Sequence, residues 1–274
     1  MGYINNFGKE NLLPELLRAK SKFFHYGIKI KVMFNFIKNI MNNKESFLTK
    51  DINSVHRILK TDIKKDPTLQ EDEILFGCGC FWGAEKCFWK LPGVVTTSVG
   101  YAGGDKKNPT YYEVCSGLTG HSEVVRIIWN KNKIDISDLL KMFWECHDPT
   151  QKNRQGNDIG TQYRSAIYYK NENNKKIILA SKEQYQKELN KKNLGSIETE
   201  IKMIDTYFFA EQYHQQYLAS EGSRQYCSAS PTKVKLDEFT GSNYKLKDHV
   251  WENFNWEVEK CVLRSNNNPI KNNI

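Results

Sequence analysis

Two cysteines separated by one glycine, Cys78 and Cys80, are the residues of this chain best placed to do chemistry. They follow a short apolar run, residues 74–76, and precede a stretch with helical spacing that ends at Pro92. Cys80 is therefore expected where a helix begins, and the unpaired backbone N–H groups there favour a thiolate over a thiol. The spacing predicts a nucleophilic cysteine, although a cysteine between a strand and a helix equally suits simple core packing.

The same cysteine pair raises the alternative of a metal site. A structural zinc site needs four clustered ligands, and the chain contains no second C-x-C or C-x-x-C pair. The chain also lacks the G-x-G-x-x-G and P-loop patterns that bind nucleotides. Glycines at 77, 79 and 83 instead leave room for a substrate close to the backbone. We therefore expect neither a metal nor an organic cofactor.

Composition is typical of a globular enzyme and excludes a disordered or membrane-spanning chain. Of the 274 residues, 39% are hydrophobic and 12% are aromatic, and no run of eighteen apolar residues occurs. The seven cysteines are odd in number and scattered, without a signal peptide, which indicates a reducing compartment and predicts a cytoplasmic location. The net charge of +8 is a moderate lysine excess, typical of a solvated surface, and we expect no nucleic-acid binding.

The ends of the chain differ in composition from its middle. No acidic residue lies between Glu15 and Glu45, where basic and apolar side chains are interleaved. Such a segment fits an organelle-targeting leader or a helix on an anionic membrane, and it also fits an extension without a function. We expect a linker with some helix from residue 51 to 72, and one further helix near residues 250–262. The predicted organisation is an N-terminal extension over residues 1–71, a catalytic domain over 72–237 and a polar tail over 238–274.

Apolar periodicity predicts that strands and helices alternate irregularly in the central domain. Strands are expected over residues 94–101, 121–129, 163–169 and 196–204, and helices over residues 81–91, 173–192 and 210–218. A further helix is expected after Ser137, which suits an N-cap. Several neighbouring strands are close enough in sequence to pair antiparallel. The pattern therefore favours an α+β two-layer sandwich over a doubly wound parallel sheet.

Six segments of the central domain together resemble the type A peptide methionine sulfoxide reductases. They are residues 79–83, 91–94, 100–104, 108–111, 120–123 and 154–165. The resemblance covers roughly residues 72–228, with the segments in the order and near the spacing of that family. It implies a ferredoxin-like core with a mixed, mostly antiparallel sheet, which agrees with the element order. It also implies an enzyme of protein repair that reduces the S epimer of methionine sulfoxide, free or in proteins.

The resemblance gives three residues a chemical role. Cys80 would attack the sulfoxide sulfur and become a sulfenic acid as methionine leaves. Glu123 matches the family's acid, which must be protonated near neutral pH to donate a proton to the oxygen. Cys227 lies where the family's first resolving cysteine is expected, and it would form a disulfide with Cys80 that thioredoxin reduces. By sequence alone, a single glutamate in a strand is more typical of a surface charge.

The resemblance also implies a binding site for the sulfoxide. Tyr111 and Tyr163 match the tyrosines that hydrogen-bond its oxygen, and Asp158 matches a carboxylate that binds the substrate backbone. Phe81 and Trp82 match the aromatic walls around its methyl group. Without the resemblance, the aromatic residues would be ordinary core or rim residues and Asp158 would be a turn residue.

The resemblance identifies less clearly which thiols would return the oxidised cysteines to their reduced form. Many bacterial members carry a further cysteine eight residues after the resolving one, but Lys235 stands there in this chain. Cys261 and Cys78 are the remaining candidates for a recycling thiol, and a tail cysteine without a function is the simpler interpretation of Cys261. Cys78, Cys87, Cys115 and Cys146 are expected to be structural, although Cys78 lies close to Cys80.

The expected partners are thioredoxin and oxidised proteins, peptides or free methionine sulfoxide, and we expect a monomer. Two rival functions stay open at the level of sequence. One is a general thiol–disulfide oxidoreductase, and the other is a non-catalytic protein that binds anionic surfaces through its basic ends.

Overall fold

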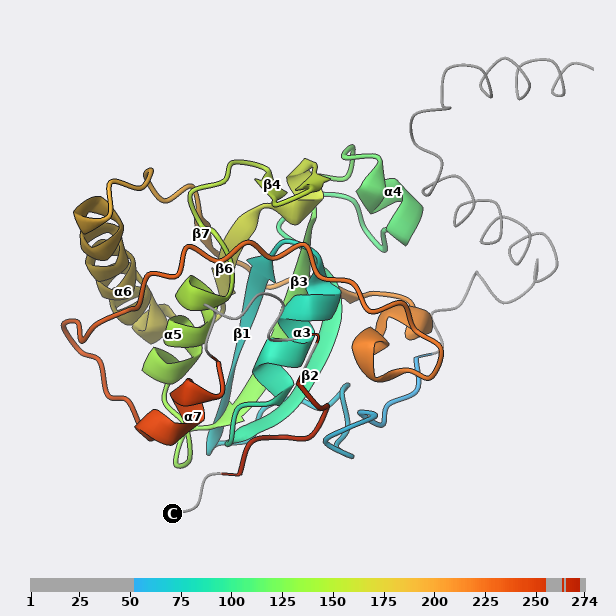
Figure 1. The fold of residues 1–274 in the computed structure, drawn as a ribbon. Coiled ribbons are helices and arrows are strands. Elements are labelled where there is room, and N and C mark those ends of the chain that lie inside the picture. The colour runs from blue at the N-terminus through green and yellow to red at the C-terminus, as the bar shows by residue number, and fades with distance from the viewer. Residues whose placement is uncertain (1–51, 255–262, 264, 272–274) are drawn as a thin grey trace, which may run out of the picture. The chain divides into compact units, whose positions relative to one another are not determined.

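A computed structural model describes residues 52–254, 263 and 265–271 of the chain (Figure 1). The basic segment between Glu15 and Glu45 lies outside these residues, and so does Cys261. The helix expected near residues 250–262 is described only as far as residue 254, where a short helix, α7 (Asp248–Glu252), is present. In the part of the chain that is described, no helix is long and apolar enough to cross a membrane.

A six-stranded sheet forms the centre of the fold, with the strand order β7-β6-β1-β3-β2-β8. Its strands are β1 (Glu71–Cys78), β2 (Val94–Ala102), β3 (Ser122–Asn130), β6 (Ser165–Tyr169), β7 (Glu200–Met203) and β8 (Tyr207–Phe209). Only the β6–β7 pair is parallel, and the other pairs are antiparallel. The predicted α+β class with a mixed, mostly antiparallel sheet is confirmed. A separate hairpin pairs β4 (Arg154–Gln155) with β5 (Asp158–Ile159).

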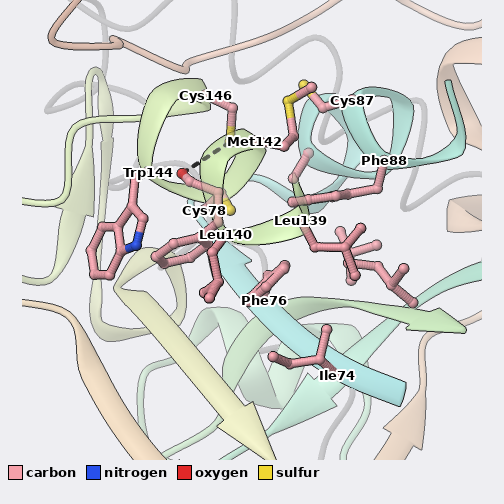
Figure 2. Close-up of a cluster of buried hydrophobic side chains, with 14 of the residues drawn as sticks. Ile74, Phe76, Cys78, Cys87, Phe88, Leu139, Leu140, Met142, Trp144 and Cys146 are labelled. Atoms are coloured by element: carbon pink, nitrogen blue, oxygen red, sulfur yellow. Dashed lines mark hydrogen bonds between the residues drawn. The ribbon is translucent and has the colours of Figure 1, made fainter. Parts of the chain in front are cut away.

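Helices α3 (Phe81–Trp89) and α5 (Ile136–Cys146) cover one face of this sheet, and α6 (Glu172–Lys191) packs beside α5 (Figure 1). Because successive side chains of a strand point to opposite faces, Ile74 and Phe76 of β1 enter the core beneath these helices. Figure 2 shows the two side chains below those of Phe88 on α3 and Leu139 on α5. Burying each such side chain contributes roughly 1.5–3 kcal/mol, so this face of the sheet positions both helices firmly.

Helix α5 starts two residues earlier than Ser137 suggests. Asp135 is its N-cap: the Asp135 carboxylate accepts hydrogen bonds from the Ser137 backbone N–H and hydroxyl, and Asp138 completes a capping box. The predicted Ser137 N-cap was therefore wrong, because aspartate and serine are both good caps and the tertiary packing chose between them. The Ser137 hydroxyl also accepts a hydrogen bond from the backbone N–H of Asn243.

The prediction of a helix over residues 210–218 was also wrong. Two short 3-10 helices, Gln212–His214 and Tyr217–Ala219, form there instead. The Gln215 side chain bonds both the N–H and the carbonyl of Val99 on β2, and Gln216 adopts a left-handed conformation with φ 48°. These tertiary hydrogen bonds replace the helical ones and break the helix.

Residues 52–70 contain no helix, contrary to expectation, and they pack against the domain. His56 is buried, and its Nε2 lies 2.9 Å from the Thr97 hydroxyl. Arg126 donates to the backbone carbonyls of Ile63 and Lys65 and pairs with Glu73 at 2.6 Å. This segment is therefore held by buried polar contacts that its polar composition did not indicate.

Candidate active site

Cys80 occupies the N-cap position of α3, directly after the end of β1, as the sequence predicts. The preceding Gly79 has φ +84°, and a Cβ atom placed on it would lie 2.5 Å from the Cβ of Gln155. Only glycine fits this turn, because it needs both a left-handed conformation and space against the β4–β5 hairpin. The turn thereby fixes the direction in which the Cys80 thiol leaves the backbone.

The Cys80 thiol does not have the lowered pKa that a helix start predicts. Burial raises the pKa of Cys80 well above its usual range, and the charge of Glu123 raises it further, while the Trp82 backbone N–H opposes these shifts. Desolvation and a like charge outweigh the helix start, so this expectation was wrong. Protonation of Glu123 would remove one of the two causes, which links the titrations of the two groups.

Glu123 lies near the start of β3 and is almost fully buried, with 2% of its surface exposed. Its Oε2 accepts a hydrogen bond from the Phe81 backbone N–H at 3.1 Å, which places the carboxyl beside the first residue of α3. Burial raises the pKa of Glu123 to about 8, and the charge of Asp158 acts in the same direction. The carboxyl therefore carries a proton at neutral pH, as a proton donor must.

Tyr111 and Tyr163 both lie close enough to this carboxyl to feel its charge. Tyr111 opens the short helix α4 (Tyr111–Cys115), and Tyr163 ends a 3-10 helix, Thr161–Tyr163. Burial raises the pKa of both phenols most, and the charge of Glu123 raises it further. Both hydroxyls therefore stay protonated. The shared electrostatic influence of Glu123 shows that the structure brings together two tyrosines that are far apart in the sequence.

Phe81 and Trp82 form an aromatic group with residues from the end of the domain. The Phe81 ring lies 5.1 Å from the His214 ring, and the Trp82 indole N–H donates to His214 Nδ1 at 3.1 Å. Trp82 is stacked on Tyr217 with ring centroids 3.9 Å apart. Phe81 is buried and Trp82 is partly exposed, so Trp82 is the more accessible of the two aromatic walls that the resemblance implies.

Asp158 lies on β5 and is held by a residue that the sequence did not single out. The Tyr226 hydroxyl donates to Asp158 Oδ1 at 2.7 Å, and the Tyr226 ring meets Trp82 edge-on. The second oxygen, Oδ2, is buried and has no hydrogen-bond partner among the described residues. A buried carboxylate oxygen without a donor is suited to an N–H group of a ligand.

Cys227 lies against the first turn of α3, the helix whose N-cap is Cys80. Its Sγ is 2.7 Å from the position that a Cβ atom would have on Gly83, so glycine is needed there for the approach. Cys227 also contributes to the raised pKa of Cys80. Its own pKa is raised to about 11, chiefly by burial. The structure therefore brings together two thiols that are 147 positions apart in the chain.

Four further residues complete the arrangement and were missed from the sequence: Gln155, Glu211, His214 and Tyr226. Glu211 accepts hydrogen bonds from the Tyr101 hydroxyl at 2.8 Å and from the Tyr111 backbone N–H at 2.9 Å, and so positions α4. Glu211 and His214 fall in the segment predicted to be an ordinary helix. Tyr226 stands directly before Cys227 and Gln155 lies in the segment 154–165, and these positions were the only signals.

The metal alternative rests on one cluster of the described residues. Ligand atoms of Cys78, Cys146 and His147 lie within 4.8 Å of one another. Both ring nitrogens of His147 already have partners at 2.7 Å, the Phe143 carbonyl and the Ser165 hydroxyl. The cluster thus offers two thiols and no free imidazole nitrogen, and the expectation of no metal stays a prediction.

A buried carboxyl with a raised pKa, two protonated phenols and two neighbouring thiols on an α+β fold define a thiol-dependent oxidoreductase site. Sequence comparison identifies the class further. The sequence model of the family described as peptide methionine sulfoxide reductase matches residues 72–247. The chain is 52% identical over 183 residues to the peptide methionine sulfoxide reductase MsrA of Vibrio vulnificus, covering 67% of this chain and 87% of that protein. It is 56% identical over 165 residues to the protein of the same name from Pseudomonas putida, and the match covers 60% of this chain and 74% of that protein. The chain belongs to the peptide methionine sulfoxide reductases, in their A type.

Solved structures agree with this assignment. Methionine sulfoxide reductase A of Corynebacterium diphtheriae superposes with a TM-score of 0.58 at 40% identity, covering 68% of this chain and 91% of that one. Mxr1 of Saccharomyces cerevisiae in reduced form gives a TM-score of 0.54 at 33% identity, and the match covers 64% of this chain and 97% of that one. The protein is an enzyme that reduces methionine S-sulfoxide, as the sequence predicts.

Proposed function

We propose that Cys80 is the nucleophile of this reaction and Glu123 its proton donor. The single observation that carries this proposal is the buried Glu123 carboxyl, protonated at neutral pH and close enough to Cys80 to raise its pKa. A sulfoxide oxygen leaves only when it is protonated or hydrogen-bonded, so an acid beside a sulfur nucleophile is what the reaction needs. Tyr111 and Tyr163, held as neutral phenols, supply the hydrogen bonds to the oxygen.

The first step is written as oxygen transfer between two sulfur atoms. Cys80 attacks the sulfoxide sulfur, the S–O bond breaks, and the oxygen ends on Cys80 as a sulfenic acid while methionine leaves. Cys227 then attacks the sulfenic sulfur, and its thiol proton leaves with the hydroxyl as water. The product is a Cys80–Cys227 disulfide, and the thiol–disulfide exchange that reduces it is proposed to use thioredoxin.

The substrate site is proposed to combine an apolar socket with one carboxylate. Trp82 and Phe81 would pack against the methyl group, and the free Oδ2 of Asp158 would accept a backbone N–H of the substrate. Fixing the oxygen, the methyl and the backbone at three points leaves room for one sulfoxide epimer. Oxidised proteins, peptides and free methionine sulfoxide all present these groups, so all three are proposed substrates.

The remaining expectations stay proposals of the same kind. We interpret the order β6-β1-β3-β2, with α3 and α5 on one face, as a ferredoxin-like two-layer core. A cytoplasmic location without nucleic-acid partners is supported by composition alone, and a monomer is proposed beside it. A general thiol–disulfide oxidoreductase would not need the protonated Glu123 or the two phenols, so the site favours sulfoxide reduction over that rival.

Replacement of the nucleophile tests the assignment. Cys80→Ser is expected to abolish reduction of a peptide that carries methionine S-sulfoxide with dithiothreitol as reductant, while the R epimer is inert with the unchanged enzyme. Cys115→Ser is not a suitable control because the Cys115 thiol contacts Tyr111, so Cys261→Ser serves as the matched thiol replacement. Retained turnover in Cys80→Ser would remove Cys80 from the mechanism.

A further inference from the structure

A group of buried thiols adjoins the catalytic cysteines and has no part in the reaction described so far. Cys78 of β1, Cys87 of α3 and Cys146 of α5 belong to one buried cluster, and Figure 2 shows Cys87 and Cys146 at its top with Cys78 below Cys146. The Cys146 thiol is close enough to hydrogen-bond with both of the others. Cys227 in turn interacts electrostatically with Cys87. The sulfur atoms therefore continue from the active site into the core.

The spacing of α3 places Cys227 between Cys80 and Cys87. Residues three and four apart lie on one face of a helix, so Cys80, Gly83 and Cys87 follow one another along the same face. The Cys227 sulfur fills the place of a side chain at the middle position, where glycine leaves room for it. It can thus approach the cysteine at either end.

The length of this arrangement suits two successive disulfides. Seven residues of helix rise about 10.5 Å, which separates Cys80 and Cys87 by two turns. A disulfide joins Cα atoms roughly 5.5–6 Å apart, so two disulfides end to end span about 11–12 Å. Displacement at sulfur needs the attacking, central and leaving sulfur atoms nearly in line. Cys227, which lies at Gly83 between the two helix cysteines, occupies the central position that such a displacement needs.

We propose that Cys87 is a third redox cysteine, which takes the disulfide from Cys227 and frees Cys80 for a second turnover before the external reductant acts. This inference rests on the proposed Cys80–Cys227 disulfide. In the step, the Cys87 sulfur attacks the Cys227 sulfur, the Cys87–Cys227 bond forms and the Cys80–Cys227 bond breaks. The proton of the Cys87 thiol goes to the departing Cys80 thiolate, and no electrons enter or leave the protein.

The step is slower than the first disulfide. Burial raises the pKa of Cys87 well above its usual range, and the charges of Lys86 and Lys90 only partly oppose this. Few Cys87 thiolates exist at neutral pH, and the thiolate is the attacking form. The exchange therefore follows as a separate phase, and Cys227, which keeps some exposed surface, remains the sulfur that an external thiol can reach.

The number of methionines formed without reductant tests the proposal. The fully reduced full-length enzyme is freed of reductant and mixed with excess peptide carrying methionine S-sulfoxide, and methionine is counted by chromatography at successive times. The expected result is two methionines per chain, one fast and one slow, with the second turnover ending in a Cys80 sulfenic acid. Cys87→Ala is expected to give one, a twofold loss, with the fast phase unchanged.

Matched variants separate this role from packing. Cys146→Ala removes a thiol of similar burial from the same cluster, and Cys261→Ser removes the tail thiol; both are expected to keep two methionines per chain. Mass-spectrometric mapping of the unchanged enzyme should find Cys87 joined to Cys227, a result that does not depend on how well any variant folds. One methionine per chain in the unchanged enzyme, a loss in Cys146→Ala, or a disulfide to Cys261 would overturn the proposal. No methionine at all would instead remove the proposed chemistry of Cys80.

Discussion

The Oε2 atom of Glu123 accepts a hydrogen bond from the backbone N–H of Phe81 at 3.1 Å. This contact fixes the carboxyl beside the residue that follows Cys80, in surroundings that largely exclude water. The hydrogen bond lowers the pKa of Glu123, whereas burial raises it by more, so the net value is about 8. The site thus holds a neutral acid in a position where an ionised one would repel the Cys80 thiolate.

The first prediction concerns the dependence of activity on pH. Because the protonated form of Glu123 is the proposed donor and its pKa is about 8, kcat/KM should fall as the pH rises above about 8. Glu123→Gln keeps the shape of the side chain but has no acidic proton, and it should lower kcat about 10²–10⁴-fold. Initial rates with a methionine S-sulfoxide peptide between pH 6 and 10 measure both effects. A rate that keeps increasing through pH 9.5 would contradict the assigned acid.

The second prediction is that Glu123→Gln stabilises the fold at alkaline pH. The folded state raises the pKa of Glu123 from 4.5 to about 8, so the folded protein holds this proton more tightly than the unfolded chain. The free energy of unfolding should therefore decrease as the pH rises from about 4.5 to 8, by at most about 1.4 kcal/mol for each pH step of one. Glutamine removes this loss. Urea unfolding should show Glu123→Gln more stable than the unchanged protein at pH 8.5, by ~2–5 kcal/mol, with little difference at pH 4.5.

Glu183→Gln on the exposed surface of α6 is the control for this measurement, because its salt bridge with Lys187 is solvent-exposed. Its effect should stay within about 0.5 kcal/mol at both pH values. An equal loss of stability in Glu123→Gln at both pH values would mean that the carboxyl is retained for packing.

The third prediction uses the approach of Cys227 to α3. In Gly83→Ala the new Cβ would lie 2.7 Å from the Cys227 sulfur, so Cys227 must move away from Cys80. The first methionine should form at the normal rate, while the Cys80–Cys227 disulfide should form at least tenfold more slowly. Quenched-flow samples, with free thiols alkylated before peptide mapping, measure the two steps separately.

Ala84→Gly is the matched control, since it changes the neighbouring position of the same helix turn. It should destabilise the helix by about 1 kcal/mol without touching Cys227. Slow disulfide formation in Ala84→Gly as well would assign the effect to helix stability.

The fourth prediction concerns the hydrogen bond between Tyr226 and Asp158. The Tyr226 hydroxyl donates to Asp158 Oδ1 at 2.7 Å, and a substrate N–H is proposed to donate to Oδ2 of the same carboxylate, so the two donors compete for its negative charge although they bind different oxygens. Tyr226→Phe removes the competitor and keeps the ring against Trp82, so KM for the peptide should decrease roughly 3–10-fold with kcat unchanged. Steady-state kinetics with peptide and with free methionine sulfoxide measure the effect. An increased KM would show that Tyr226 binds the substrate instead of competing with it.

Much of the local structure was predictable because short patterns determine it. The end of β1, the glycine turn and the start of α3 follow from an apolar run, a left-handed glycine and helical spacing that lie close together in the sequence. Two of the wrong predictions, the Ser137 N-cap and the helix over residues 210–218, concern places where distant groups compete with local hydrogen bonds. The Ser137 hydroxyl donates to the Asp135 carboxylate and accepts from the Asn243 backbone N–H. The Gln215 side chain accepts a hydrogen bond from the Val99 backbone N–H.

The sequence by itself indicated the class of the enzyme and its candidate residues, because six contiguous segments resemble one family in order and spacing, whereas the residue types alone left other roles open. Only the tertiary structure decided the protonation of these groups and their distances. Burial raises the pKa values of Glu123 and Cys80 together, and that burial comes from strands and helices that pack from all parts of the domain. The approach of Cys227 to Gly83, and the line of thiols that continues to Cys87, likewise arise from packing between segments far apart in the chain, which no local pattern encodes.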